Sequence, residues 1–251
     1  MVYFWDENIG FAQGDPVDGE YELYTTVDGG ENWTEVDGDN IPNPLDGEYG
    51  YVRQIEVFED NVWYTTNKGR IYHSTDKGFN WVVYNTNVTD FAGIRLSFAN
   101  ENDGVYIDSS GAVYRSFNGG ASWQQIDTQG PIYTTDLSYA PNSNIIFTTG
   151  ASSAGTGSSV SFDGGYNWTG IDAGTQHTEV EFIDENTGWS GGFNYSETQG
   201  GIFVWDPVEL SVESLDANEF ISFYPNPVSD FLNISYLSLI HISEPTRLWT
   251  I

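Results

Sequence analysis

The sequence predicts an all-β protein: a β-propeller of four-stranded antiparallel blades, followed by a short C-terminal extension. One observation is an eight-residue turn motif that occurs four times, with its final tryptophans 48, 42 and 45 residues apart. A second is an Asn- and Asp-rich hairpin turn in the first half of each unit. A period of roughly 40 to 50 residues is typical of one propeller blade. The aromatic content of 16% and the 28 glycines also fit many short strands joined by tight turns.

The recurring motif reads as a self-closing turn between the last two strands of a unit. Its Asp or Asn accepts hydrogen bonds from nearby backbone N–H groups, and the following glycine allows a positive φ. The tryptophan three residues later begins the returning strand and covers the turn. We interpret these positions as structural, and they are Asp28, Gly30, Trp33, Asp76, Gly78, Trp81, Asn118, Gly120, Trp123, Asp163, Gly165 and Trp168.

Five units can be counted along the chain, and the last one lacks the motif. Their approximate limits are 1–38, 52–86, 94–128, 135–171 and 178–206. Closed propellers usually have about four to eight blades, so five is an allowed number. However, the chain begins inside a strand pattern, and an open array leaves an unpaired edge. We therefore expect a truncated larger ring.

The four motifs resemble those of the Asp-box (BNR) repeat propellers. This broad group contains sialidases, xyloglucanases, sortilin-type receptors and photosystem II assembly-factor-like proteins. The resemblance covers residues 1–206 and implies that the boxes are structural elements at the blade periphery, away from the ligand face. It leaves the activity open, because one fold hosts many functions.

The C-terminal segments are predicted to lie outside the propeller. Residues 207–218 form an acidic linker, and residues 219–237 resemble the beginning of a Bacteroidetes type IX secretion sorting domain. Residues 238–251 depart from that family's pattern and resemble translated adapter sequence, so we interpret them as a non-native tail. The sorting-motif residues are Tyr224, Pro225, Asn226 and Pro227. This resemblance implies export, with the type IX secretion machinery as a partner.

The charge of the chain narrows the classes of ligand. The formal net charge is −30, with only seven Lys plus Arg, which disfavours nucleic acid and anionic membranes. No apolar stretch is long enough to span a membrane, and no signal peptide is recognisable at Met1. We expect an extracellular or outer-surface location, with the signal peptide missing from this chain. Acidic loops offer weak candidates for Ca²⁺, with solvated turns as the alternative, and their carboxylates are Asp15, Asp18, Asp37 and Asp39.

No catalytic residue can be assigned from the sequence. A sialidase needs a converging arginine cluster, and we interpret Arg70 and Arg115 as equivalent surface positions that do not converge. No metal-ligand spacing, nucleophile elbow or phosphate loop occurs. The abundance of carboxylates leaves one enzymatic alternative, a secreted glycoside hydrolase acting on a polysaccharide.

We therefore predict an exported, non-enzymatic β-propeller that binds a glycan or a protein at the cell surface or outside the cell. No cofactor is expected apart from the Ca²⁺ alternative. Aromatic residues outside the boxes are candidate ligand contacts, with blade packing as the alternative for each of them. These aromatics are Trp63, Tyr64, Tyr106, Trp189 and Tyr195.

Overall fold

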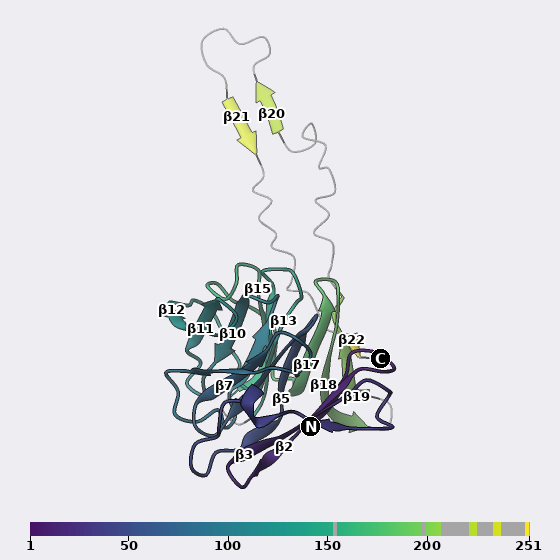
Figure 1. The fold of residues 1–251 in the computed structure, drawn as a ribbon. Coiled ribbons are helices and arrows are strands. Elements are labelled where there is room, and N and C mark those ends of the chain that lie inside the picture. The colour runs from purple at the N-terminus through teal and green to yellow at the C-terminus, as the bar shows by residue number, and fades with distance from the viewer. Residues whose placement is uncertain (153–154, 197–198, 207–220, 225–232, 237–248, 251) are drawn as a thin grey trace.

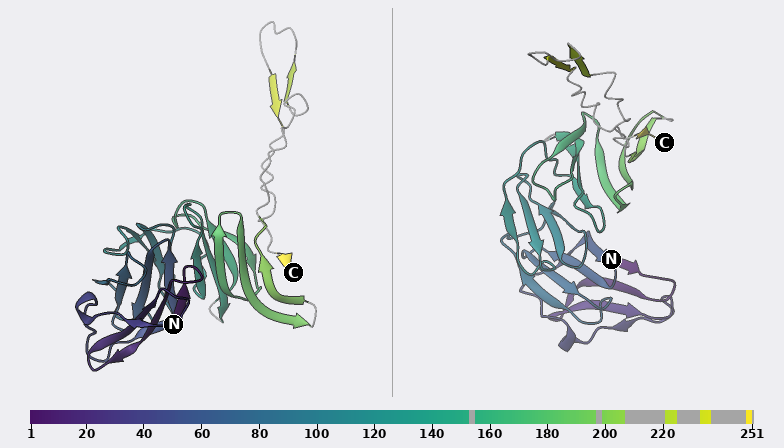
Figure 2. Two further views of the ribbon diagram at one scale, coloured as in Figure 1. Left: turned by 45° about the vertical axis from the view of Figure 1, so that its right-hand side comes forward. Right: turned by 90° about the horizontal axis from the view of Figure 1, so that it is seen from above.

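The computed structural model describes residues 1–152, 155–196, 199–206, 221–224, 233–236 and 249–250. Five four-stranded antiparallel sheets follow one another along the chain, which confirms the predicted propeller architecture. Figure 2 shows these blades arranged along an arc, with the first and fifth blades at its two ends. In the described part of the chain, the only helical element is the 3-10 turn η1 (Gly38–Asn40). No helix there has the length and apolar character needed to cross a membrane.

The strands of each blade occur in chain order from the centre outward. Blade 1 contains β1 (Val2–Phe4), β2 (Gly10–Val17), β3 (Glu20–Thr26) and β4 (Thr34–Glu35). Blade 2 contains β5 (Gly50–Phe58), β6 (Asn61–Thr66), β7 (Arg70–Ser74) and β8 (Val82–Asn85). Blade 3 contains β9 (Arg95–Phe98), β10 (Asp103–Ile107), β11 (Val113–Phe117) and β12 (Gln124–Ile126). Blade 4 contains β13 (Asp136–Tyr139), β14 (Ile146–Ser152), β15 (Gly155–Ser161) and β16 (Thr169–Ala173).

The fifth blade is completed differently from the others. It contains β17 (His177–Asp184), β18 (Thr187–Ser196), β19 (Gln199–Val204) and β22 (Trp249–Thr250). It has no Asp box, yet Trp205 packs against Phe182 and Phe147, as the box tryptophans do elsewhere. A separate hairpin pairs β20 (Ile221–Tyr224) with β21 (Asn233–Tyr236). Pro225, Asn226 and Pro227 lie outside the described residues. Trp249 and Thr250, which were expected in a tail outside the propeller, instead pair with β19 as the fourth strand of blade 5; the rest of the division of the C-terminal segments stays a prediction.

Each Asp box closes its turn with the same set of hydrogen bonds. In the second box, the Asp76 carboxylate accepts from the backbone N–H of Asn80 at 2.8 Å and from the Ser74 hydroxyl at 2.9 Å. The same hydroxyl accepts from the backbone N–H of Gly78 at 2.9 Å. Gly78 has a φ of 90°, the left-handed conformation that glycine adopts without a Cβ clash. The other three boxes repeat this pattern, with Asn118 replacing the aspartate in the third.

Two pairs of neighbouring blades, 2 with 3 and 4 with 5, are joined by a large aromatic side chain from the second strand of the preceding blade. Trp63 on β6 stacks on Phe98 of β9 with ring centroids 3.9 Å apart, and its indole N–H donates to the Gly119 carbonyl at 2.9 Å. Phe147 on β14 stacks on Phe182 of β17 at 3.7 Å. Aromatic stacking therefore fixes the order and spacing of consecutive sheets.

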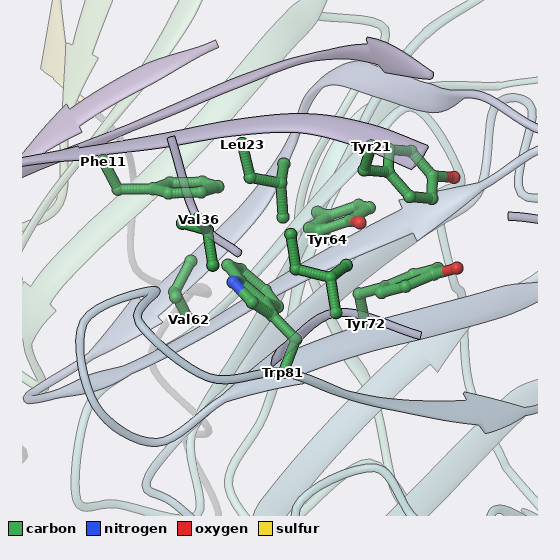
Figure 3. Close-up of a cluster of buried hydrophobic side chains, with 9 residues drawn as sticks. Phe11, Tyr21, Leu23, Val36, Val62, Tyr64, Tyr72 and Trp81 are labelled. Atoms are coloured by element: carbon green, nitrogen blue, oxygen red, sulfur yellow. The ribbon is translucent and has the colours of Figure 1, made fainter. Parts of the chain in front are cut away.

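The core between the first two blades shows the same principle (Figure 3). The rings of Tyr21 and Tyr64 meet edge to face with centroids 5.6 Å apart, and those of Tyr64 and Tyr72 stack at 4.8 Å. Beside them lies an ion pair between Arg70 and Glu48, in which the Arg70 Nε donates to the carboxylate at 2.9 Å. Burial by itself raises the pKa of Glu48, but hydrogen bonds from Arg70, from a threonine hydroxyl and from a backbone N–H lower it overall.

The interpretation of Arg70 and Arg115 as equivalent surface residues is wrong. Both are buried, and the guanidinium of Arg115 donates to the Gly164 carbonyl in the box of the next blade. The register pairs Arg115 with Val105, and His73 with Trp63. Trp63 and Val105 occupy matching positions in the second strands of blades 2 and 3. His73 is therefore the counterpart of Arg115, and only the strand pairing reveals this relation.

We predict that Asp76→Ala lowers the free energy of unfolding by about 1–3 kcal/mol, because it leaves the backbone N–H of Asn80 without its acceptor. Asp76→Asn keeps one acceptor oxygen, as Asn118 does naturally, and we expect a smaller loss. Urea denaturation followed by tryptophan fluorescence measures both. Asp46→Ala, at an exposed loop carboxylate, is the control, and equal effects of Asp46→Ala and Asp76→Ala would contradict the role of the box.

Candidate functional site: a cavity along the inner strands

The inner strands of blades 2 to 5 (β5, β9, β13 and β17) place polar residues at matching positions. Glu56, Ser97, Ser138 and Glu181 each stand opposite a residue of the second strand of their own blade. Residues two positions earlier in the same strands share that face, because side chains alternate along a strand. These earlier residues are Gln54, Arg95, Asp136 and Glu179. Figure 1 shows β5, β13 and β17 converging near the middle of the propeller body.

All of these residues except Ser97 and Ser138 line one cavity of about 540 Å³, which we call the inner-strand cavity. Its wall continues from the inner strands of blades 2 to 5 onto the outer strands of blade 5. The lining residues are Gln54, Ile55, Glu56, Arg95, Leu96, Asp136, Leu137, Glu179, Val180, Glu181, Trp189, Ser190, Gly191 and Ile202. Apolar and acidic side chains therefore meet in a single open space.

Asp136 is the most tightly held carboxylate of the cavity. One of its oxygens lies 3.1 Å from the Arg95 Nε, and the other accepts from the backbone N–H of Val180 at 2.8 Å. Burial raises the pKa of Asp136 to about 6, although the Val180 N–H and the Arg95 charge oppose that shift. Asp136 thus links the inner strands of blades 3, 4 and 5.

Glu56 shares its surroundings with two other carboxylates. The Ser97 hydroxyl donates to Glu56 at 3.3 Å, and its oxygen accepts from the backbone N–H of Tyr139 at 3.1 Å. Burial raises the pKa of Glu56 well above its ordinary value, and the charges of Glu181 and Asp136 raise it further. This carboxyl group therefore holds a proton more strongly than an exposed glutamate does.

Glu181 touches the solvent of the cavity but is surrounded by the cavity walls. This partial removal from water raises its pKa to about 7, and the nearby charge of Asp136 adds to the effect. Glu181 is an exposed residue, but the surrounding protein displaces part of the water around its carboxylate. Carboxyl groups with pKa values near 6 and 7 exchange protons close to neutral pH.

Trp189 gives the cavity an exposed aromatic wall. It stands opposite Glu181, as Trp63 stands opposite Glu56 and Phe147 opposite Ser138. Trp63 and Phe147 are buried against the following blade, whereas 40% of Trp189 is exposed. On the neighbouring strand β19, 54% of Ile202 is exposed in the same wall. The face of blade 5 that points away from blade 4 therefore remains unpartnered among the described residues.

A hydrogen-bonded Ser190–His177–Asp172 chain lies behind this wall. The His177 Nε2 is 2.8 Å from an Asp172 carboxylate oxygen, and its Nδ1 is 2.8 Å from the Ser190 hydroxyl. Sequence reasoning missed this chain because Asp172, His177 and Ser190 come from three different strands, which only the fold brings together. Only 2% of Ser190 and none of His177 is exposed, so a substrate cannot reach the hydroxyl. The arrangement gives the buried side chains of Ser190 and His177 hydrogen-bond partners within blade 5 and the adjoining strand of blade 4.

The residues predicted from the sequence lie in several different places. None of the Asp-box residues lines the inner-strand cavity. Trp63, Tyr64 and Tyr106 were predicted ligand contacts, but each is 0% exposed. For these three residues the packing alternative is correct, because each side chain fills the space between blades. Trp189 does line the cavity, and the side chain of Tyr195 lies outside what the structure describes.

The four predicted Ca²⁺ ligands do not gather at one point. Asp37 and Asp39 line a shallow hollow together with Glu20 and Glu35, whereas Asp15 and Asp18 do not. Within the described residues, no group of three or more His, Cys, Asp or Glu side chains is arranged to hold a metal ion. A Ca²⁺ site in this chain stays a sequence-based prediction.

The fold and this cavity define an Asp-box β-propeller with an acidic centre. The chain belongs to the family of the photosynthesis system II assembly factor YCF48, whose family model matches residues 5–163, more than half of the sequence. Among curated proteins, no sequence matches this chain.

Solved structures with the same fold include both binding proteins and enzymes. A structure of YCF48 bound to a D1 peptide aligns with a TM-score of 0.55 at 20% identity, covering 82% of this chain and 62% of that one. The GH74 enzyme of Niastella koreensis aligns at 0.50 with 17% identity, covering 82% and 36%. The GH74 xyloglucanase of Xanthomonas campestris aligns at 0.50 with 13% identity, covering 80% and 36%. This chain therefore spans less than two thirds of each of these proteins, and the likeness establishes the fold alone.

We predict that Glu181→Gln changes how stability depends on pH. The folded pKa of about 7 lies above the ordinary value of 4.5, so folded wild-type protein retains a proton that the unfolded chain releases. Wild-type stability should therefore fall relative to Glu181→Gln as pH rises from about 4.5 to 7, and the difference should level off above that range. Urea denaturation at several pH values measures this difference.

The matched control for that measurement is Glu185→Gln. It removes a carboxylate from the turn of the same hairpin, outside the cavity. Parallel pH profiles for wild type and Glu181→Gln would contradict the proposed environment of Glu181.

Proposed function

We propose that this protein is a non-enzymatic propeller that binds a segment of a partner protein in the inner-strand cavity. The observation that carries the proposal is the open space of about 540 Å³ in which the exposed indole of Trp189 stands beside the inner-strand carboxylates. Ligand sites commonly combine apolar walls with a few placed polar groups. The peptide bound by the related YCF48 structure supports a protein partner over other ligand classes.

We further propose that the protein acts at the cell surface or outside the cell after type IX secretion. The support is the Tyr224-Pro225-Asn226-Pro227 sequence following the propeller, together with the strongly acidic composition. The secretion machinery would then be a second partner. Protection of the protein from protease added to whole cells would contradict this location.

A change at Trp189 provides a direct test of the binding site. We expect a library of displayed 12-residue peptides to yield binders of the wild-type protein. Trp189→Ala should weaken the affinity of these peptides at least tenfold, because tryptophans that become buried on binding are frequent hot spots. Phe193→Ala is the matched control: Phe193 is an exposed aromatic residue on the same strand, outside the cavity. Isothermal titration calorimetry measures the affinities.

Two outcomes of this selection would overturn the proposal. The first is that no peptide is enriched by the wild-type protein. The second is that the enriched peptides bind Trp189→Ala as tightly as wild type. A glycan array run in parallel tests the other ligand class, because an exposed indole also stacks on sugar rings. Glycan binding that depends on Trp189 would show that the site binds a carbohydrate and not a protein segment.

A secreted glycoside hydrolase is the second candidate function. Its specific support is that Asp136 and Glu181, with pKa values raised to about 6 and about 7, line one cavity. Glycoside hydrolysis uses a protonated carboxyl group as acid and an ionised one as base or nucleophile. The salt bridge of Asp136 to Arg95 and its bond to Val180 favour a structural role instead. Release of reducing ends from a polysaccharide panel, abolished by Glu181→Gln and retained by Glu185→Gln, would establish the enzyme.

A further inference from the structure

We propose that the segment bound in the inner-strand cavity carries a lysine or arginine, whose cationic end is placed between Glu56 and Glu181 and whose aliphatic stem lies along Trp189 and Ile202. This inference rests on the proposed binding function and names the chemistry of its ligand. It follows from the charges of the lining, from the unpartnered face of blade 5 and from the dimensions of the site.

The described charges of the lining are predominantly negative. Four carboxylates line the cavity, and Arg95 is the one cationic side chain among its lining residues. Arg95 already forms a salt bridge with Asp136 at 3.1 Å. Neither Glu56 nor Glu181 forms an ion pair with a residue that the structure describes. A cation entering the cavity therefore finds two carboxylates that lack a positively charged partner there.

The apolar part of the wall suits the stem of a long cationic side chain. Trp189 and Ile202 are 40% and 54% exposed, and they project from the sheet face that no described blade covers. Lysine and arginine cover apolar surface with their methylene groups while the charged end reaches a polar site. The indole face also attracts a cation directly, which adds to the carboxylate interaction.

The same geometry argues against a bare metal ion as the occupant. The carboxylates of the lining lie near one another, but among the described residues no group of three or more is arranged to hold a metal ion, and a divalent cation requires several close oxygen ligands. A guanidinium or ammonium group makes separate hydrogen bonds to carboxylates that do not share one point. The net charge of −30 also steers cationic segments toward the protein over long distances.

Protonation of the lining should compete with this ligand. The titratable groups that line the cavity are Glu56, Asp136, Glu179 and Glu181, and the fixed positive charge is Arg95. Burial and mutual repulsion raise the pKa of Glu56, and burial with the Asp136 charge raises that of Glu181 to about 7. Cation binding should therefore strengthen between pH 6 and pH 8, as Glu181 ionises.

The test uses the full chain and peptides resynthesised from the selection described above. Each lysine is replaced by acetyl-lysine and each arginine by citrulline, which keep the aliphatic stem and remove the charge. We expect wild-type protein to bind the charged form at least tenfold more tightly at pH 8, and this preference to shrink at pH 6. In Glu181→Gln the preference should fall severalfold, with the affinity for the neutral form unchanged.

Glu185→Gln serves as the matched control and should retain the full preference for charge. Glu56→Gln is the second variant, and near-ultraviolet circular dichroism confirms that each variant is folded before titration. Equal binding of charged and neutral peptides, or an unchanged preference in both Glu181→Gln and Glu56→Gln, would overturn the inference. Enriched peptides without lysine or arginine would overturn it while leaving the proposed binding function in place. Failure to enrich any peptide would instead overturn the binding function itself.

Discussion

The packing of one blade against the next depends on a side chain from the second strand, inserted against the inner strand of the following sheet. Trp63 on Phe98 and Phe147 on Phe182 are the closest cases, with ring centroids 3.9 and 3.7 Å apart. A single four-stranded sheet has two faces and cannot bury both alone. Each stacked pair covers one face of two sheets at once, and repetition along the chain generates the arc.

The Asp boxes serve this packing rather than ligand binding. Each box closes the turn before the outermost strand, and the third and fourth boxes present backbone carbonyls to the preceding blade, Gly119 to Trp63 and Gly164 to Arg115. The hydrogen bonds within each box keep these carbonyls in position. This explains why a short polar motif recurs in a protein whose stability depends on large apolar contacts between sheets.

The inner-strand cavity results from the same repeated register. Polar side chains on one inner strand accept backbone N–H groups of the next, as Asp136 does from Val180 and Ser138 from Phe182. Glu181 occupies the corresponding position in blade 5 and faces open space instead. Carboxylates brought together in this way raise one another's pKa, which costs folding free energy near neutral pH. Natural proteins commonly accept such a cost at functional sites.

The motif spacing was sufficient to predict the propeller, the first four blades and the box turns, because these depend on local hydrogen bonds and on a strand period visible in the sequence. It did not predict the outer strand of blade 5 at Trp249 and Thr250. The burial of Trp63, Tyr64 and Tyr106 was not predictable in the same way. The local sequence around an aromatic residue in a strand does not show whether its side chain faces a neighbouring blade or solvent. Trp189 is distinguished from Trp63 only by the absence of a described blade on its free side.

The convergence of Glu56, Asp136 and Glu181 likewise required three strands separated by more than forty residues to meet at one centre. The sequence by itself therefore determined the repeating unit, whereas the tertiary arrangement decided which polar and aromatic residues share a cavity, because that depends on how whole sheets are placed around a common axis.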